Sequence, residues 1–307
     1  MTGTTESAME FEAHRPRMFG LAYRMLGSAD EAEDVVQDAY LRWDGADRSA
    51  VERPSAWLAK VVTNLCLNRL TSARARREQY PGPWLPEPVV TGGGALGPLE
   101  SAEQRDAVST ALLVLLERLT PTERAVYVLR EAFAYSHREI AGVLDVSEAN
   151  SRQLYRRAAG RVTEHGARFP ARGERDEQRH RELVESFVAA AREGDVAGLE
   201  KVLAADVTLW SDGGGVVSAA RRPILGRDKV LRFLAGVMPR YTGAMRFTTA
   251  EVNGTTALVA WVGGTLAATA TFEVRDGAVT AVHSVVNPNK LVFAERQLSH
   301  PGEPVGS

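Results

Sequence analysis

Four planar hydrogen-bond donors lie close together between residues 136 and 161. Arg152, Gln153, Arg156 and Arg157 share one face of a predicted helix. Guanidinium and amide groups suit phosphates and base edges, and one bidentate contact to a base is worth about 1–3 kcal/mol of discrimination. The spacing therefore predicts a helix that contacts DNA. An ordinary helical hairpin with solvated arginines is the alternative.

The elements around these donors have helix-turn-helix geometry. A short helix with an apolar face ends near Asp145, and a second helix begins at Ser147, whose side chain suits a cap position. Leu154 on the second helix is predicted to face the core, which turns the arginines outward. Glycine is common in such a turn, and this chain has Asp145 there instead.

A second set of polar side chains lies between residues 57 and 77. Asn64 and Asn68 are four residues apart, so they share a helix face and can hydrogen-bond to an unstacked base. For each asparagine alone, a solvent-facing position is an equal alternative. The arginines that follow are predicted to contact phosphates, which fixes position and not sequence. Trp43 and Trp57 are predicted to pack in the core in preference to stacking on bases.

The pattern of apolar residues divides the 307-residue chain into helical and mixed parts. Apolar positions recur at helical spacing up to about residue 78 and again in 101–168, and a Pro- and Gly-rich stretch separates the two. Hairpin signals appear later, at Asn253-Gly254 and Asp276-Gly277. The sequence predicts two all-α domains at 8–79 and 103–168, a linker at 80–102, an α+β domain at 178–292 and a tail at 293–307.

Hydroxyl residues mark three predicted helix starts. Ser28, Thr120 and Ser136 are each followed three residues later by Glu, which is the pattern of a capping box. These boxes predict helix boundaries and carry no information on function.

The formal net charge of −2 conceals strong segregation along the chain. Residues 1–50 contain ten acidic and five basic residues, whereas 53–77 contain six basic and no acidic residues. A second basic block, 151–175, has seven arginines against two glutamates. Two basic blocks predict phosphate contacts at two separate places, and solvated helix faces are the equal alternative.

Composition excludes several classes of protein. No apolar run is long enough for a membrane span, and the first residues do not form a secretory signal, so we expect a cytoplasmic protein without a membrane partner. Cys66 is the single cysteine, which excludes an intrachain disulfide and a thiolate metal cage. No cofactor and no metal site are predicted.

Residues 22–43 and 56–70 together closely resemble region 2 of extracytoplasmic-function (ECF) sigma factors. The resemblance implies that the acidic-then-apolar segment binds the β′ clamp of RNA polymerase and that 44–54 captures a flipped base. The residues implied to contact polymerase are Asp30, Glu33, Asp34, Gln37, Asp38, Leu41 and Trp43. Those implied to contact the −10 element are Trp57, Lys60, Asn64, Asn68, Arg69, Arg74, Arg76 and Arg77.

Residues 107–165 resemble region 4 of the same family. The resemblance implies that this module reads the −35 element and that core RNA polymerase, through its β′ clamp and β flap, and promoter DNA are the partners. The residues implied to contact the −35 element are Ser147, Arg152, Gln153, Arg156 and Arg157. A helix-turn-helix regulator with an effector domain is the alternative, although it does not explain the segment Asp30–Trp43.

The order of elements after residue 180 resembles the SnoaL-like branch of the NTF2-like fold, in which helices cover one face of a curved antiparallel sheet to form a cone. Three motifs resemble those of sigma factors with this extension: Trp84, Leu85, Pro86, Glu87 and Pro88; Asp212, Gly213, Gly214 and Gly215; and Asn287, Pro288, Asn289, Lys290 and Leu291. The chain departs from the family pattern at Val216 and Asn289, where a basic residue and an aspartate are usual.

The resemblance implies that this extension regulates the sigma domains in cis, without a separate anti-sigma factor. It leaves open a small ligand inside the cone. Asp212 and His283 are candidate acid–base groups, with Trp210 and Trp261 as pocket aromatics, but nothing in the sequence places them together. Since fold does not imply function, we expect no independent enzyme.

Overall fold

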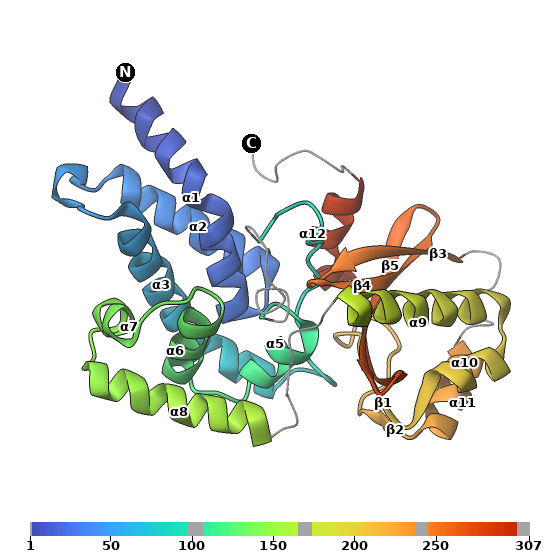
Figure 1. Cartoon of the computed structure of the whole chain (residues 1–307). Helices are drawn as coiled ribbons and strands as arrows, with labels where there is room; N and C mark the ends of the chain where they lie inside the picture. Colours follow the sequence, from blue (N-terminus) through green and yellow to red (C-terminus); the bar gives the residue numbers. More distant parts are fainter. Residues whose placement is uncertain (1, 97–106, 165–173, 238–244, 300–307) are drawn as a thin grey trace. The chain divides into compact units, whose positions relative to one another are not determined.

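The computed structural model describes residues 2–96, 107–164, 174–237 and 245–299 (Figure 1). The chain forms two compact units. The first contains Met1–Glu78 with Gly94–Phe169, and the second contains Gln79–Gly93 with Pro170–Ser307. The segment predicted as a linker is therefore divided between them, because its first half packs with the C-terminal unit.

The first unit is all-α. Its first module consists of α1 (Thr2–Leu26), α2 (Ala29–Asp44), a 3-10 turn (Arg48–Ala50) and α3 (Pro54–Glu78). Its second module consists of α5 (Thr110–Leu116), α6 (Pro121–Glu131), α7 (His137–Leu144) and α8 (Glu148–Glu164). Helix α6 contacts both α1 and α3, so the two modules share contacts within the unit.

The caps predicted from the sequence are present. The Ser28 hydroxyl accepts from the Glu31 amide at 3.1 Å, and α2 begins at Ala29, directly after Ser28. Thr120 and Ser136 both form complete capping boxes, at the starts of α6 and α7. Each box satisfies amides that the first helical turn leaves without a partner.

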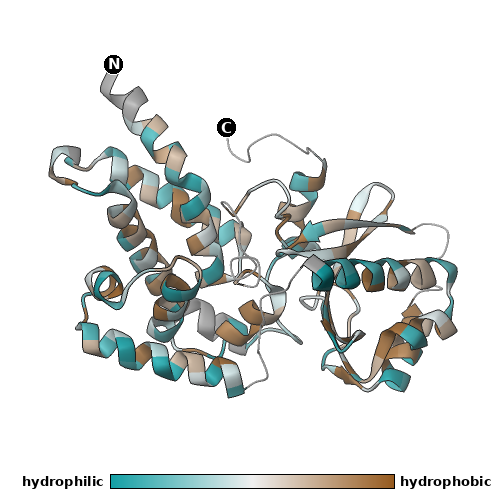
Figure 2. Ribbon diagram, in the orientation of Figure 1, coloured by the Kyte–Doolittle hydropathy of each residue, from teal (hydrophilic) through white to brown (hydrophobic). Residues whose placement is uncertain are grey.

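The helix-turn-helix is formed by α7 and α8. Asp145 ends α7 in the left-handed region, with φ 54° and ψ 44°. Aspartate is one of the few residues besides glycine that visit this region as single residues, which explains how this turn forms without glycine. Leu154 is buried as predicted, and Figure 2 shows hydrophilic and hydrophobic residues alternating along α8.

The second unit is α+β. In chain order it contains α9 (Glu174–Glu193), α10 (Val196–Val202), β1 (Leu203–Asp212), β2 (Ile224–Leu225), α11 (Arg227–Val237), β3 (Met245–Val252), β4 (Thr255–Val262), β5 (Thr265–Arg275), β6 (Ala278–Val285) and α12 (Pro288–Ser299). The sheet order is β2-β1-β6-β5-β4-β3. The predicted fold class, two helical domains followed by an α+β domain, is confirmed.

One detail of the sheet was predicted wrongly. The sequence suggested an antiparallel sheet, but β1 and β6 pair in parallel. A parallel neighbour requires a long connection, and here the whole stretch from β2 to β5 lies between the two strands. The other pairings are antiparallel, and the predicted hairpins at Asn253-Gly254 and Asp276-Gly277 have the positive φ angles of tight primed turns.

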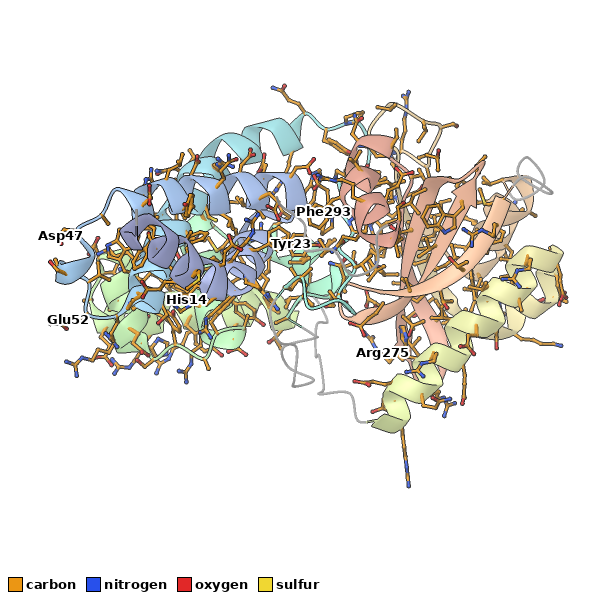
Figure 3. The ribbon with its side chains drawn as sticks, turned by 90° about the horizontal axis from the view of Figure 1, so that it is seen from above. His14, Tyr23, Asp47, Glu52, Arg275 and Phe293 are labelled. Atoms are coloured by element: carbon orange, nitrogen blue, oxygen red, sulfur yellow. The ribbon has the colours of Figure 1, made fainter. Side chains whose placement is uncertain are left out.

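The two faces of the sheet have different roles. Leu209 on β1 and Val282 on β6 are paired in register, and both lie in the core cluster with α9, α10 and α11. Because successive strand residues point to opposite faces, the next pair, Trp210 and His283, lies on the other face. Helix α12, which carries Phe293, packs along β5 (Figure 3).

No helix within the described ranges is long and apolar enough to cross a membrane.

Candidate functional site

The predicted polymerase surface lies on α2. Asp30, Asp34, Gln37 and the large apolar side chain of Leu41, which is 64% exposed, all reach the surface. Glu33 and Asp38 are partly buried, since Arg15 donates to Glu33 at 2.9 Å and Arg69 donates to Asp38 at 2.8 Å. Exposed carboxylates can complement a basic protein surface, and Leu41 adds an apolar side chain beside them.

Trp43 belongs to the core. Its side chain is 1% exposed, its indole Nε1 donates to the Ser7 carbonyl at 3.2 Å, and its ring lies 5.6 Å from that of Trp57. Direct contact with a protein partner would require the core to open. We therefore correct its predicted polymerase contact to packing, which the sequence also favoured.

The predicted −10 residues lie on α3 and differ in how far they are exposed. Asn64 and Asn68 are exposed and lie one turn apart, while Trp57 is partly exposed. Arg74 and Arg76 are in the helix, but their side chains lie outside the described residues. The asparagines therefore keep the geometry that base contacts require.

The remaining −10 cations are engaged within the unit. Lys60 donates to the Gly142 carbonyl at 3.1 Å and to Asp145 at 2.9 Å, at the turn of the helix-turn-helix. Arg69 donates to the Glu31 carbonyl at 2.9 Å and to Asp38. In this arrangement these two predicted −10 contact residues pair instead with groups of the protein itself.

Arg77 connects the two helical modules. It donates to Glu117 at the end of α5 and to the Leu26 carbonyl, and Arg124 donates to the same Glu117 carboxylate. Burial lowers the pKa of Arg77, while Glu117 opposes that shift. The predicted phosphate contact of Arg77 is corrected for this arrangement, because the guanidinium is largely buried in an ion-pair cluster.

The predicted −35 donors lie on α8. Arg152, Gln153, Arg156 and Arg157 are all exposed, and the Ser147 hydroxyl caps the helix by accepting from the Asn150 amide at 3.1 Å. Arg152 pairs with Glu148 at 2.5 Å and Arg157 with Glu123 at 3.4 Å. The Arg152–Glu148 pair is exposed on both sides, so little free energy opposes its exchange for phosphate. The buried Glu123 also pairs with Arg161, which stays in place when Arg157 turns to DNA.

The three motifs of the C-terminal unit converge on Asp212, which is fully buried at the end of β1. Its Oδ1 accepts from the Tyr80 hydroxyl at 2.6 Å and from the Gly214 amide at 3.1 Å. Its Oδ2 accepts from the Leu85 amide and from Lys290 Nζ, both at 2.8 Å. We call Asp212, Tyr80, Leu85 and Lys290 the linker lock.

Lys290 supplies the charge that balances Asp212. Its ammonium group also donates to the Leu85 carbonyl at 2.5 Å and lies over the rings of Trp84, at 4.2 Å, and Tyr80, at 4.8 Å. A buried ammonium with a carboxylate, a carbonyl and two aromatic faces is well compensated. Burial, followed by the Asp212 hydrogen bond, raises the pKa of Tyr80, so the phenol stays protonated as a donor.

Glycine is required at the centre of the second motif. Gly214 has φ +59°, and a Cβ there would collide with the amide group of Asn287. That amide donates to the Tyr80 hydroxyl at 2.9 Å, so the second and third motifs both contact the linker tyrosine. Val216 and Asn289, the two departures from the family pattern, are exposed and lie outside the linker lock.

After the linker lock, the linker pairs with β3, an edge strand of the sheet. Val90 forms a β-bridge with Val252 of β3, and the Asn253 amide donates to the Val89 carbonyl at 2.9 Å. The Asn253 side chain accepts from the Val89 amide at 3.1 Å, and Gln297 of α12 exchanges two hydrogen bonds with Val90. Residues 80–91 are thus held at both ends by one domain.

Sequence reasoning missed Tyr80, Asn253 and Gln297. Asn253 was identified only as part of a turn, and no local pattern distinguishes Tyr80 or Gln297 from other polar surface residues. Their partners lie more than 130 positions away in the chain, so only the fold reveals them.

The candidate acid–base groups do not form a pair. Asp212 belongs to the linker lock, whereas His283 is 4% exposed and stacks on Trp210 with ring centroids 4.8 Å apart. Burial lowers the pKa of His283 to about 4. Glu273 lies 3.6 Å from the imidazole Nε2, and Trp261 lies on β4, donating to Thr248 at 3.2 Å. Trp210 and His283 also point away from the helix-covered core.

Comparisons with known proteins identify both helical modules. The family described as Sigma-70 region 2 matches residues 11–76, and Sigma-70, region 4, matches residues 109–162. The chain is 40% identical over 291 residues to the ECF RNA polymerase sigma factor SigJ of Mycobacterium tuberculosis, covering 92% of each chain. It is 31% identical to the probable ECF RNA polymerase sigma factor SigI of the same species, covering 92% of this chain and 93% of the relative.

The similarity to SigJ extends to a solved structure. The crystal structure of M. tuberculosis SigJ matches with a TM-score of 0.72 and 37% identity, covering 93% of this chain and 98% of that one. The match spans both units described above.

Proposed function

This chain belongs to the ECF family of RNA polymerase sigma factors, and from that premise we propose that its C-terminal domain regulates promoter-specific initiation in cis through the linker lock. As a sigma factor the protein acts with core RNA polymerase on promoter DNA. The observation that carries the proposal is the convergence of linker and C-terminal motifs on buried Asp212.

The linker is the segment through which the C-terminal domain can act. Regions 2 and 4 of a sigma factor must contact two promoter elements at once, so the chain that joins them has to adopt the separation that the promoter sets. Here residues 80–91 are hydrogen-bonded to β1, β3 and α12. While they stay bound, the linker cannot extend, which supports control by the C-terminal domain without a separate anti-sigma protein.

Contacts within the helical unit support the same conclusion. Lys60 and Arg77, both expected to contact DNA on the −10 side, are held by Asp145 and Glu117 of the second module. Promoter phosphates and these carboxylates compete for the same cations. We call the helical unit with these two ion pairs formed the closed unit. It is a resting arrangement, and promoter binding exchanges its intramolecular ion pairs for pairs with phosphate.

We assign promoter and polymerase contacts to the exposed residues of the predicted sets. Asn64 and Asn68 read the −10 element, and the arginines of α8 contact the −35 element through phosphates and base edges. Asp30, Asp34, Gln37 and Leu41 form the polymerase surface on α2. A small ligand inside the cone stays a prediction, as does action in the cytoplasm.

Catalysis by the C-terminal domain is not part of the proposal. The Asp212 carboxylate already accepts four hydrogen bonds, and the neutral His283 ring packs against Trp210. A general acid or base needs a substrate proton within hydrogen-bonding reach, which these packed side chains do not offer. A helix-turn-helix regulator remains the second candidate, but the region 2 match argues against it.

In vitro transcription with sigma-free core polymerase tests the proposal. The full-length protein should direct initiation from a matching promoter, and Asp212→Asn should change the yield severalfold because it weakens the linker lock. Asp206→Asn is the matched control, since Asp206 is an exposed aspartate on the same strand. Initiation that is equal for all three proteins would refute regulation through the linker, and no initiation from any promoter would refute the assignment to DNA and polymerase contacts.

A further inference from the structure

A cleft of about 970 Å³ opens between the two modules of the helical unit. One wall is formed by α1, which contributes His14 and Arg17 (Figure 3, His14 labelled), and by the chain from Arg53 to Lys60 at the start of α3. The opposite wall is formed by α7 and the residues before it, from Tyr135 to Val143. The family assignment does not explain why a cleft of this size should be kept between the modules.

The charge of the lining is strongly positive. Arg17, Arg53, Lys60 and Arg138 line the cleft, and Glu139 is the one carboxylate among its described lining residues. Glu139 is already committed, because it accepts from the Ser136 amide at 2.8 Å and from its hydroxyl at 2.7 Å. These hydrogen bonds hold the pKa of Glu139 below its ordinary value. Lys60 pairs with Asp145 at the rim of the turn, so the three arginines are the cations that lack a matching number of carboxylates inside the cleft.

The cations are also presented in a way that suits phosphate. The Arg17 guanidinium lies over the ring of Phe133, at 5.3 Å, and that of Tyr135, at 6.0 Å. A guanidinium stacked on aromatic faces keeps its N–H edge available for planar, two-point hydrogen bonding. Lys60 adds a point charge beside Trp57.

We propose that this cleft binds a diphosphate group, either as inorganic pyrophosphate or as part of a nucleoside diphosphate. Cations lie on both walls, from α1 and the start of α3 on one side and Arg138 on the other, so a ligand with two linked phosphates can pair with both walls at once. Such a ligand bridges the two modules and favours the closed unit.

The consequence for transcription rests on the proposed function. Trp57 and Lys60 belong both to the cleft and to the predicted −10 contacts, so a bound diphosphate and the −10 strand compete for them. The ligand would therefore lower promoter binding. The binding site itself can be tested without polymerase or DNA, so its failure is distinguishable from failure of the proposed function.

Isothermal titration calorimetry of the full-length protein at low salt provides the test. Inorganic pyrophosphate and adenosine diphosphate are titrated separately, and at least one should bind at a single site. Arg17→Ala and Arg138→Ala should each weaken binding about tenfold, the loss of one charge-assisted contact of ~1.4 kcal/mol. Arg118→Ala is the matched control, because Arg118 is an exposed arginine of the same unit outside the cleft.

The outcomes separate the ligand sources and the alternatives. Equal affinity for both probes supports recognition of the diphosphate alone, and tighter binding of the nucleotide supports an added contact of its base with Trp57 or Tyr135. Binding by neither probe overturns the proposal, as does a loss in Arg118→Ala equal to that in Arg17→Ala. Cleft-dependent binding of only a −10 single-stranded oligonucleotide also overturns it and assigns these cations to the DNA backbone.

Discussion

Replacing Asp212 with asparagine should destabilise the C-terminal unit strongly. The substitution keeps the volume of the side chain but removes the negative charge that faces Lys290, which is itself buried. It also places an amide donor among the three N–H and O–H donors that now point at the carboxylate. Breaking one side of a buried ion pair costs about 3–5 kcal/mol, because the remaining charge loses its compensation.

Differential scanning calorimetry of the full chain measures this effect. The C-terminal unit has about 150 residues, and in a domain of that size each kcal/mol shifts the melting temperature by about 2–4 °C. Asp212→Asn should therefore lower the melting temperature of one transition by about 6–20 °C and leave the transition of the helical unit in place. Asp206→Asn should change it by no more than the ~0.5 kcal/mol of an ordinary surface substitution.

A double-mutant cycle with Lys290→Met identifies the cause. If the loss in Asp212→Asn arises from an uncompensated ammonium group, removing that group recovers part of the stability, and the double variant is more stable than the sum of the single effects predicts. Limited proteolysis between Tyr80 and Thr91 should accelerate in Asp212→Asn because the linker detaches. Additive effects in the cycle, or a melting temperature equal to that of the Asp206 control, would refute the linker lock.

Three further predictions concern α8, the turn before it and His283. Arg152→Ala combined with Arg156→Ala should weaken binding to a −35 duplex by about 10–100-fold in fluorescence anisotropy, with Arg118→Ala as control; unchanged affinity would reassign α8 to structure. Asp145→Val should destabilise the helix-turn-helix by about 1–2 kcal/mol in denaturant titration, because φ is 54° there, and Asp145→Gly, which accepts that angle, should destabilise it less. The pKa of His283 falls from 6.5 to about 4 on folding, so its contribution to stability is complete above pH 6.5 and is lost toward pH 4, by up to ~3 kcal/mol. His283→Phe should flatten this part of the pH–stability curve, and an unchanged slope would show that the imidazole titrates normally.

Local patterns predicted the local structure well. Ser28, Thr120 and Ser136 cap helices because a hydroxyl and a following glutamate determine a helix start within four residues. The Asn253-Gly254 turn formed for a similar reason, since both residues accept positive φ. A third tight turn, at Gly263-Gly264, carries the same signal and was overlooked. The parallel pairing of β1 and β6 could not be read locally, because it depends on where the chain returns.

In the candidate site, too, local features were predictable and contacts between distant residues were not. Exposed donors on α8 followed from helical periodicity, because Leu154 fixes which face is buried. The intramolecular roles of Lys60 and Arg77 did not, since each pairs with a residue in another module. Sequence patterns report the type of a side chain and its face. They do not report whether a carboxylate elsewhere in the protein already pairs with that side chain, because such a pairing depends on the whole fold.

The docked linker limits how far regions 2 and 4 can separate. An extended chain spans at most ~3.3–3.6 Å per residue, so the segment Gln79–Gly93 withholds up to ~50 Å of reach while it is bound to the C-terminal domain. Tyr80 lies two residues beyond the end of α3, so region 2 has almost no free chain before the linker lock begins. Release at Asp212 alone would free only the first part, because Val90 and Thr91 are held separately at the β3 edge. Full extension therefore requires both contacts to break, and the free energies of the two add. A domain can in this way set the threshold for promoter binding by the strength with which it holds one peptide segment.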